Sequence, residues 1–189
     1  MKHPQDLPQT GPDIPDAILA ERAGDGDVAA FETLARRHGP LMRAYARRLA
    51  RSHDEADDVV QEALITAWRD IGSLQDGAAV KAWLMKIVGH RAVDTGRRRK
   101  VHDNFDDRPE APDHTPGPAQ SAVAGSARRA LNAALARLPE EQRRCWVLRE
   151  FGGQSYEEIA GTLGISAASV RGRLARARTT LVIEMEEWR

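Results

Sequence analysis

Two runs of basic residues and one run of acidic residues are the parts of this sequence whose side chains have the clearest chemistry. The basic runs cover residues 91–100 and 166–178, and the acidic run covers residues 54–62. The formal charges of the whole chain cancel to zero, so it is their segregation that is informative: it predicts at least two different partners, or one region of the chain masking another. The sequence shows no glycine-rich phosphate loop, no nucleophile triad and no histidines at metal-ligand spacing. We therefore expect a binding protein that is not an enzyme and that needs no metal or other cofactor.

Residues 155–178 predict a helix-turn-helix. Ser155 and Glu158 have the spacing of a capping box, Gly164 suits the left-handed end of the first helix, and Ser166 suits the start of the second. The second helix carries an apolar stripe that would dock it on the first, formed by Val170, Leu174, Ala177 and Leu181. A structural hairpin with solvated arginines is the alternative. The basic second helix favours entry into a major groove.

The face of this second helix opposite the apolar stripe predicts how it would read DNA. Ser169, Gly172 and Arg176 lie near the centre of that face, and Arg171 lies beside it. We expect Ser169 and Arg176, with Arg171 in support, to contact base edges. The arginines on the flanks are expected to contact phosphates: Arg173 and Arg178.

Residues 54–71 predict an amphipathic helix with one acidic face. Its apolar face carries Val60, Ala63, Leu64, Ala67, Trp68 and Ile71. Its polar face carries Asp54, Asp57, Asp58, Gln61 and Glu62. Carboxylates suit the first turn of a helix, so a solvated face is one interpretation. Because neighbouring like charges repel, a docking surface for a basic partner is the interpretation that we favour.

A third charged helix, covering about residues 79–99, ends in the basic sequence GRRRK. Cations suit the C-terminus of a helix, which gives this run a structural reason. Four consecutive bases exceed that need, so the sequence predicts phosphate contacts by Arg97, Arg98, Arg99 and Lys100.

The composition predicts an all-α protein with two small helical bundles. The polar, proline-containing residues 1–12 predict a flexible tail, and residues 101–126 predict an acidic, proline-rich linker between domains at 13–100 and 127–189. Cys145 is the single cysteine and lies in an apolar run, so we expect a core residue. There is neither a signal peptide nor an apolar run near the ~20 residues of a membrane span, which predicts a cytoplasmic protein without membrane insertion.

Three motifs in this order resemble bacterial RNA polymerase sigma factors of the extracytoplasmic-function (ECF) group of the sigma-70 family. They are DEADDVVQEALITAWR, AWLMKIVGHRAVDTGRRRK and LPEEQRRCWVLREFGGQSYEEIAGTLGISAASVRGRLARAR. The first resembles the core-binding helix of sigma region 2, and the second resembles the following helix, which contributes to recognition and melting of the minus-ten element. The third resembles region 4, which reads the minus-thirty-five element. The resemblance covers about residues 29–181.

The resemblance implies a role in transcription initiation for each charged surface. The acidic face would bind the clamp helices of the beta-prime subunit of core RNA polymerase, and region 4 would bind the beta flap. Lys86, His90 and Arg91 would join the bases at 97–100 in holding promoter DNA, and the loop at 72–77 would capture a flipped base. Relatives often have asparagine in place of His90. The family also implies an anti-sigma factor as a partner, and a stress or envelope response.

A second hypothesis is a stand-alone helix-turn-helix transcriptional regulator with an N-terminal sensor or dimerisation domain. Both hypotheses predict DNA as a partner. A stand-alone regulator needs neither an acidic docking helix nor a DNA-melting helix, so these two features favour the sigma factor.

Overall fold

The computed structural model describes the backbone of residues 14–103 and 122–186, and the side chains of residues 14–98 and 129–186. Within those residues the regular structure is helical and contains no strand, which confirms the predicted all-α fold. The predicted tail at 1–12 and most of the predicted linker lie outside the described residues. The linker is flanked by helices that extend into both of its ends, because α4 runs to Asp103 and α5 begins at Ala122.

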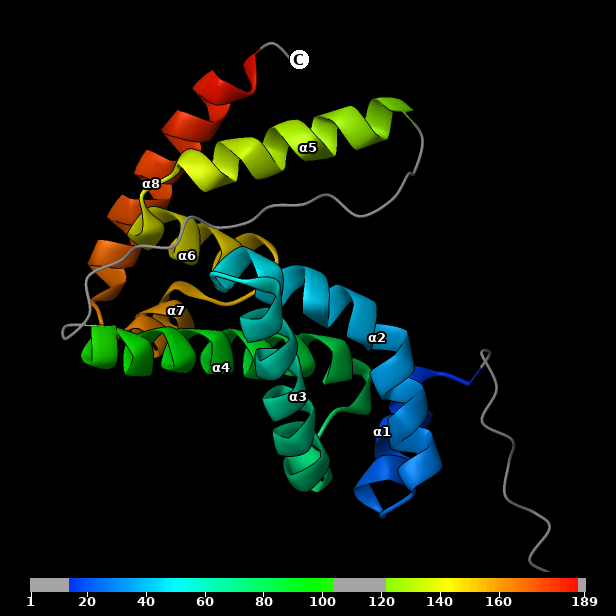
Figure 1. Cartoon of the computed structure of the whole chain (residues 1–189). Helices are drawn as coiled ribbons and strands as arrows, with labels where there is room; N and C mark the ends of the chain where they lie inside the picture. The colour runs from blue at the N-terminus through cyan, green and yellow to red at the C-terminus, as the bar shows by residue number, and fades with distance from the viewer. Residues whose placement is uncertain (1–13, 104–121, 187–189) are drawn as a thin grey trace, which may run out of the picture.

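The first group of helices surrounds an apolar core (Figure 1). It consists of α1 (Asp16–Gly24), α2 (Val28–Leu49), α3 (His53–Asp70), the 3₁₀ turns η1 (Ile71–Ser73) and η2 (Gly77–Ala79), and α4 (Val80–Asp103). The amphipathic pattern of α3 explains how it enters this core, since Val60, Ala63 and Ala67 are all buried. Side chains from the other helices meet them there, including Leu19, Leu34, Met42, Leu84 and Val88.

A short ion-pair cluster fixes the N-terminal helix on its neighbour. The carboxylate of Asp16 in α1 accepts a hydrogen bond from Arg37, and its second oxygen lies 2.8 Å from Nε2 of His38. His38 is buried, and Asp16 is about three-quarters buried. Burial opposes ionisation of Asp16, but the hydrogen bonds from Arg37 and His38 outweigh it and hold the pKa of this carboxyl below its usual value.

The second group of helices contains the predicted helix-turn-helix. It consists of α5 (Ala122–Arg137), α6 (Glu140–Glu150), α7 (Tyr156–Leu163) and α8 (Ala167–Glu184). The C-terminal half of α8 packs against α5 in a small cluster of its own, made of Ala134, Leu135, Leu138, Ala177 and Leu181. The N-terminal half of α8 belongs to the larger core, where Val170 and Leu174 are buried.

The local signals of the helix-turn-helix are confirmed one by one. Ser155 Oγ accepts a hydrogen bond from the backbone N–H of Glu158, and the Glu158 carboxylate accepts one from Ser155 N–H at 2.8 Å. Gly164 ends α7 with φ 66°, a left-handed conformation that a Cβ would strain. Ser166 caps α8 through the backbone N–H of Ser169. The turn between the two helices is therefore set by residues at fixed offsets.

The two groups of helices pack together, which the sequence does not predict. Helix α6 lies on α2 and helix α7 lies on α4, so the expected bundles share one apolar core (Figure 1). Leu148 and Ile159 from the second group are buried in the same cluster as Leu84 and Val88 from the first. The structure is therefore closed, with the helix-turn-helix held against the first helical group.

Candidate nucleic-acid and protein interfaces

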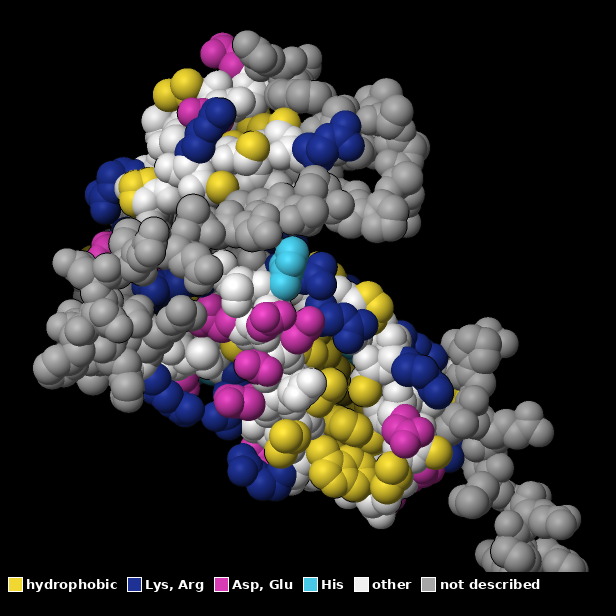
Figure 2. Space-filling model, viewed as in Figure 1, with side chains coloured by type: hydrophobic (Ala, Val, Ile, Leu, Met, Phe, Trp, Pro, Cys, Tyr) yellow, Lys and Arg dark blue, Asp and Glu magenta, His cyan; other side chains and the backbone are white. Residues whose placement is uncertain are grey.

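The acidic face of α3 lies on the molecular surface. Figure 2 shows acidic side chains gathered along α3. Asp54, Asp58, Gln61 and Glu62 are exposed, whereas Asp57 is partly buried, with its Oδ1 buried and unpaired in the protein. A basic partner that approaches this face would meet four polar side chains directly, and would also offer Asp57 a hydrogen-bond donor.

An exposed apolar patch adjoins this acidic face (Figure 2). Ile65 is 69% exposed on α3, and Val28 is 56% exposed at the start of α2. Trp68, which the sequence places on the buried face of α3, is 38% exposed and packs edge-on against Phe31 with ring centroids 5.1 Å apart. Ile65 lies outside the apolar stripe of α3, so the helical periodicity of apolar residues does not predict this patch. Neighbouring acidic and apolar side chains form a surface typical of protein docking.

Some basic residues of α4 contact other helices, some are exposed, and the last two have side chains outside the described residues. Arg91 donates a hydrogen bond to the Thr66 hydroxyl at 2.9 Å, which ties α4 to α3. Arg97 and Arg98 are exposed near the end of the helix. The side chains of Arg99 and Lys100 are outside the described residues. The basic end of α4 thus extends from a helix that is held on α3 by the hydrogen bond from Arg91.

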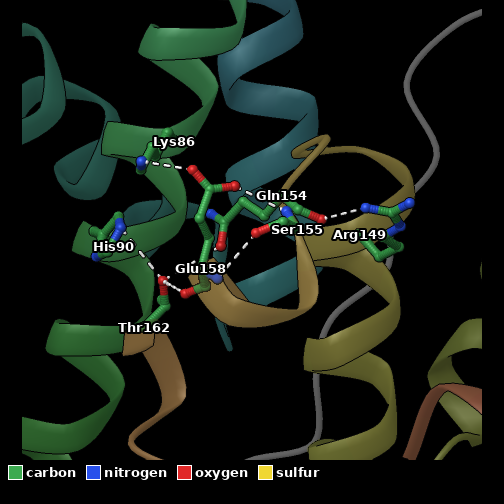
Figure 3. Close-up of polar contacts among 7 residues, drawn as sticks. All are labelled: Lys86, His90, Arg149, Gln154, Ser155, Glu158 and Thr162. Carbon is green, nitrogen blue, oxygen red and sulfur yellow. Dashed lines mark hydrogen bonds and ion pairs between the residues drawn. The ribbon is translucent and has the colours of Figure 1, made fainter. Parts of the chain in front are cut away.

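Three polar side chains of α4 contact the helix-turn-helix, and Figure 3 shows two of them, Lys86 and His90. Lys86 Nζ lies 2.7 Å from Oε1 of Glu158. His90 Nε2 lies 3.3 Å from the Thr162 hydroxyl, and Arg97 donates to the Thr162 backbone carbonyl at 2.9 Å. These contacts join residues about 70 positions apart, as the sequence separations of 72, 72 and 65 show. Sequence reasoning missed them because no local pattern reports a pairing between distant helices.

The surroundings of these contacts shift the pKa values of Glu158 and His90. The hydrogen bond from Lys86, aided by that from Ser155 N–H, holds the pKa of Glu158 below its usual value. Partial burial, together with the nearby charge of Lys86, lowers the pKa of His90. The neutral form of His90 and the ionised form of Glu158 are therefore favoured.

The face of α8 opposite its apolar stripe is exposed, as the sequence predicts, and one of the flanking arginines is an exception. Ser169, Arg171, Arg176 and Arg178 are exposed, and the half-buried Gly172 lies among them. Arg173 instead turns toward α6, where its guanidinium lies 2.7 Å from the Glu141 carboxylate and is 20% exposed. The three exposed arginines therefore form the basic surface of the recognition helix in this structure.

The described part of the chain offers no site for metal chemistry. No group of three or more His, Cys, Asp or Glu residues lies close enough there to hold a metal ion. Cys145 is buried, as predicted, and burial raises the pKa of its thiol, so the reactive thiolate is disfavoured. None of the helices among these residues is long and apolar enough to cross a bilayer.

An acidic docking helix, a basic helix and a helix-turn-helix define a class of DNA-binding protein that also binds a protein partner. Family models extend this description: Sigma-70 region 2 matches residues 34–101, and Sigma-70 region 4 matches residues 128–181. The ECF RNA polymerase sigma factor SigM of Mycobacterium tuberculosis is 38% identical over 168 residues, which cover 88% of this chain and 82% of SigM. The ECF RNA polymerase sigma-E factor of Escherichia coli is 33% identical, with coverage of 89% and 93%. The chain belongs to the ECF sigma factors of the sigma-70 family.

Solved structures agree with this assignment. The sigma factor RpoE of Bartonella quintana, in complex with the anti-sigma factor NepR, matches with a TM-score of 0.63 and 28% identity, over 84% of this chain and 98% of that chain. The sigma factor CnrH in complex with the cytosolic domain of CnrY matches with a TM-score of 0.56 and 28% identity, over 91% and 97%. The chain therefore shares its fold with these two sigma factors.

Proposed function

We propose that this alternative sigma factor docks on core RNA polymerase through the acidic face of α3 and the adjoining apolar patch. The observation that carries the proposal is the exposure of Asp58 and Glu62 beside the exposed side chains of Ile65 and Trp68. The basic clamp helices of the beta-prime subunit have the charge that this face requires. Region 4 binds the beta flap, and the polymerase supplies the catalysis, so the chain acts in the cytoplasm as a specificity subunit.

Promoter DNA is held at two places in this proposal. Lys86, His90 and Arg91 on α4, with the bases at 97–100, hold the minus-ten region while the loop at 72–77 receives a flipped base. On α8, Ser169, Arg171 and Arg176 contact base edges of the minus-thirty-five element, and each good arginine–guanine pair contributes about 1–3 kcal/mol of discrimination. Arg178 contacts phosphate. Arg173, which is paired with Glu141 in this structure, exchanges that carboxylate for a phosphate when DNA binds.

The test is charge reversal of the acidic face in the full chain. The double variant Asp58→Arg with Glu62→Arg changes two exposed side chains and leaves the partly buried Asp57 intact. We expect affinity for core polymerase to fall more than about tenfold, because like charges then meet at the interface. The matched control reverses Glu21 and Glu32, which are exposed on α1 and α2. An equal loss in both variants, or no loss in either, would contradict the docking surface.

A second test addresses transcription. Holoenzyme reconstituted from this chain and core polymerase should give run-off transcripts from a genomic library of promoters, and the double variant should give none. A chain that binds DNA but forms no complex with core polymerase would instead be the stand-alone regulator. Membership of the ECF group supports an anti-sigma partner and a role in a stress or envelope response, for which co-purification with a candidate anti-sigma factor is the test.

A further inference from the structure

A run of arginines along α2 has no role in the proposed function. Residues 33–53, which cover most of α2 and the turn after it, contain six arginines and no aspartate or glutamate. Three of these arginines have partners within the protein: Arg37, Arg48 and Arg51. The other three are exposed to solvent: Arg36, Arg43 and Arg47.

The three exposed arginines lie on one face of α2, and we call them the arginine stripe. They occupy positions i, i+7 and i+11, a spacing that returns to nearly the same angle around a helix. At 1.5 Å per residue the stripe extends about 17 Å along the helix. Figure 2 shows Lys and Arg side chains spaced along α2. The opposite side of α2 is buried in the core and includes Leu34, Met42, Tyr45 and Leu49.

The arginine stripe has no anionic partner within residues 14–98 and 129–186. Arg43 and Arg47 make no hydrogen bond or ion pair there, and Arg36 donates to the hydroxyl of Thr33 in its own helix at 3.3 Å. Cations suit the C-terminus of a helix, which accounts for Arg47 in the last turn of α2. Arg36 and Arg43 lie before that turn, so the helix dipole does not account for them.

A nucleic-acid strand is the ligand whose shape and charge fit the arginine stripe. A line of cations along one face of a helix is the electrostatic footprint of a protein that binds a line of phosphates. The guanidinium group binds phosphate oxygens through two parallel hydrogen bonds, which favours arginine at such positions. Promoter DNA is also a ligand of the sigma factors to which this chain belongs. DNA is therefore the polyanion that the stripe is expected to meet.

We propose that the arginine stripe binds the sugar-phosphate backbone of promoter DNA, as a third DNA contact besides those on α4 and α8. This goes beyond the proposed function, because the stripe lies on the solvent side of α2, opposite the core that α2 shares with α4. Phosphate contacts carry no base preference, so the stripe adds affinity for every DNA sequence. The salt dependence of DNA binding is the property that reports it.

The first experiment measures DNA binding by the full-length chain as a function of salt concentration. The stripe variant combines Arg36→Gln, Arg43→Gln and Arg47→Gln, and the probe is a fluorescently labelled DNA duplex of random sequence. We expect its affinity at low salt to fall more than about tenfold, and the slope of log K against log salt to become shallower by about two to three, because each phosphate contact contributes about 0.9. Lysine at the same three positions keeps the charges and should keep the slope of the parent chain.

The matched control removes the same net charge at three other exposed positions: Arg69→Gln, Arg129→Gln and Arg137→Gln. Circular dichroism verifies that all three variants are folded, and the control should keep the slope of the parent. An equal loss of slope in the stripe variant and the control would show an effect of net charge alone and would overturn the proposal. An unchanged slope in the stripe variant, a slope that lysine does not restore, or no binding by the parent at low salt would overturn it too.

The second experiment locates the contact in the promoter complex. Cys145 is the single cysteine and is buried, so Arg43→Cys supplies one accessible thiol for an aryl azide photo-cross-linker. Holoenzyme that contains this labelled variant should cross-link to labelled promoter DNA on irradiation. The control is Asp25→Cys, an exposed position before the start of α2 and more than about 20 Å from Arg43, which should give no DNA adduct.

The identity of the cross-linked molecule decides between DNA and a protein partner. An adduct of the Arg43→Cys chain with a polymerase subunit in place of DNA would identify an acidic protein surface as the occupant and overturn the proposal. If the parent holoenzyme forms no promoter complex, the proposed function itself has failed, and the salt dependence with the random duplex then decides the arginine stripe alone.

Discussion

Two glycines of helix α7, three residues apart, are predicted to respond with opposite sign to the same substitution. Gly161 lies inside α7 with open space around the position of its missing Cβ. Gly164 ends the helix with φ 66°, and a Cβ there would lie 3.0 Å from the Arg97 guanidinium. Alanine at Gly161 should raise the free energy of unfolding, because alanine is favoured over glycine in a helix interior by about 1 kcal/mol. Alanine at Gly164 should lower it, because the left-handed conformation costs a residue with a Cβ about 1–2 kcal/mol.

The expected difference in the free energy of unfolding between the two variants follows from these two values. Alanine at Gly164 regains part of the cost by restricting the unfolded chain, which leaves a net loss of about 1 kcal/mol. The two variants should then differ by about 2 kcal/mol, or about 4–8 °C in melting temperature for a chain of this size. Urea unfolding, monitored by circular dichroism, measures this difference if the dependence of the free energy of unfolding on urea concentration is the same in both variants. A shift of the same sign in both variants would refute the assignment of the turn to the conformation of Gly164.

Two further predictions concern the side chains that fix helix ends. Asp16→Asn should lower the free energy of unfolding by about 2 kcal/mol at pH 7, because it removes the charge that accepts from Arg37 and faces His38. The pKa of Asp16 is lowered in the folded chain, so its contribution to stability is fully present above its ordinary pKa of 3.8 and is lost as the pH falls from there through the lower pKa of the folded chain. Thermal unfolding of the parent and variant should therefore converge only once the pH has fallen below the folded pKa of Asp16, and a difference that does not shrink as the pH is lowered would contradict the mechanism. Ser155→Ala should cost about 1 kcal/mol by removing the cap at Glu158 N–H, whereas Ser155→Asn should restore most of it, as thermal unfolding of both would show.

The sequence predicts the helix-turn-helix well because its signals are local. Ser155, Glu158, Gly164 and Ser166 act on backbone groups within four residues of themselves, so spacing alone determines the outcome. The apolar stripe of α8 is also a matter of spacing. Its four predicted members are all buried: Val170, Leu174, Ala177 and Leu181.

The contacts that close the molecule have no such local signal. Thr162 and Gln154 are polar, and nothing in their neighbourhood in the sequence predicts that they are 4% and 1% exposed. Arg173 belongs to a basic run that predicts phosphate contact, yet its nearest partner is Glu141, more than 30 positions earlier in the chain. A pattern along one helix reports which face is apolar, but it does not report which distant helix covers a polar side chain.

Helix α8 is one continuous rod that packs against α5 as well as α6 and α7, and this determines how a force on the chain would be transmitted. Its 18 residues span about 27 Å. The first half is fastened to α7 through Val170 and Leu174, and the second half is fastened to α5 through Ala177 and Leu181. Helix α5 is also the point at which the chain enters region 4 from the first domain. A pull on that entry point would therefore act on the C-terminal half of α8, and we expect the helix to tilt as a rigid lever and so change the angle of the face proposed to read DNA.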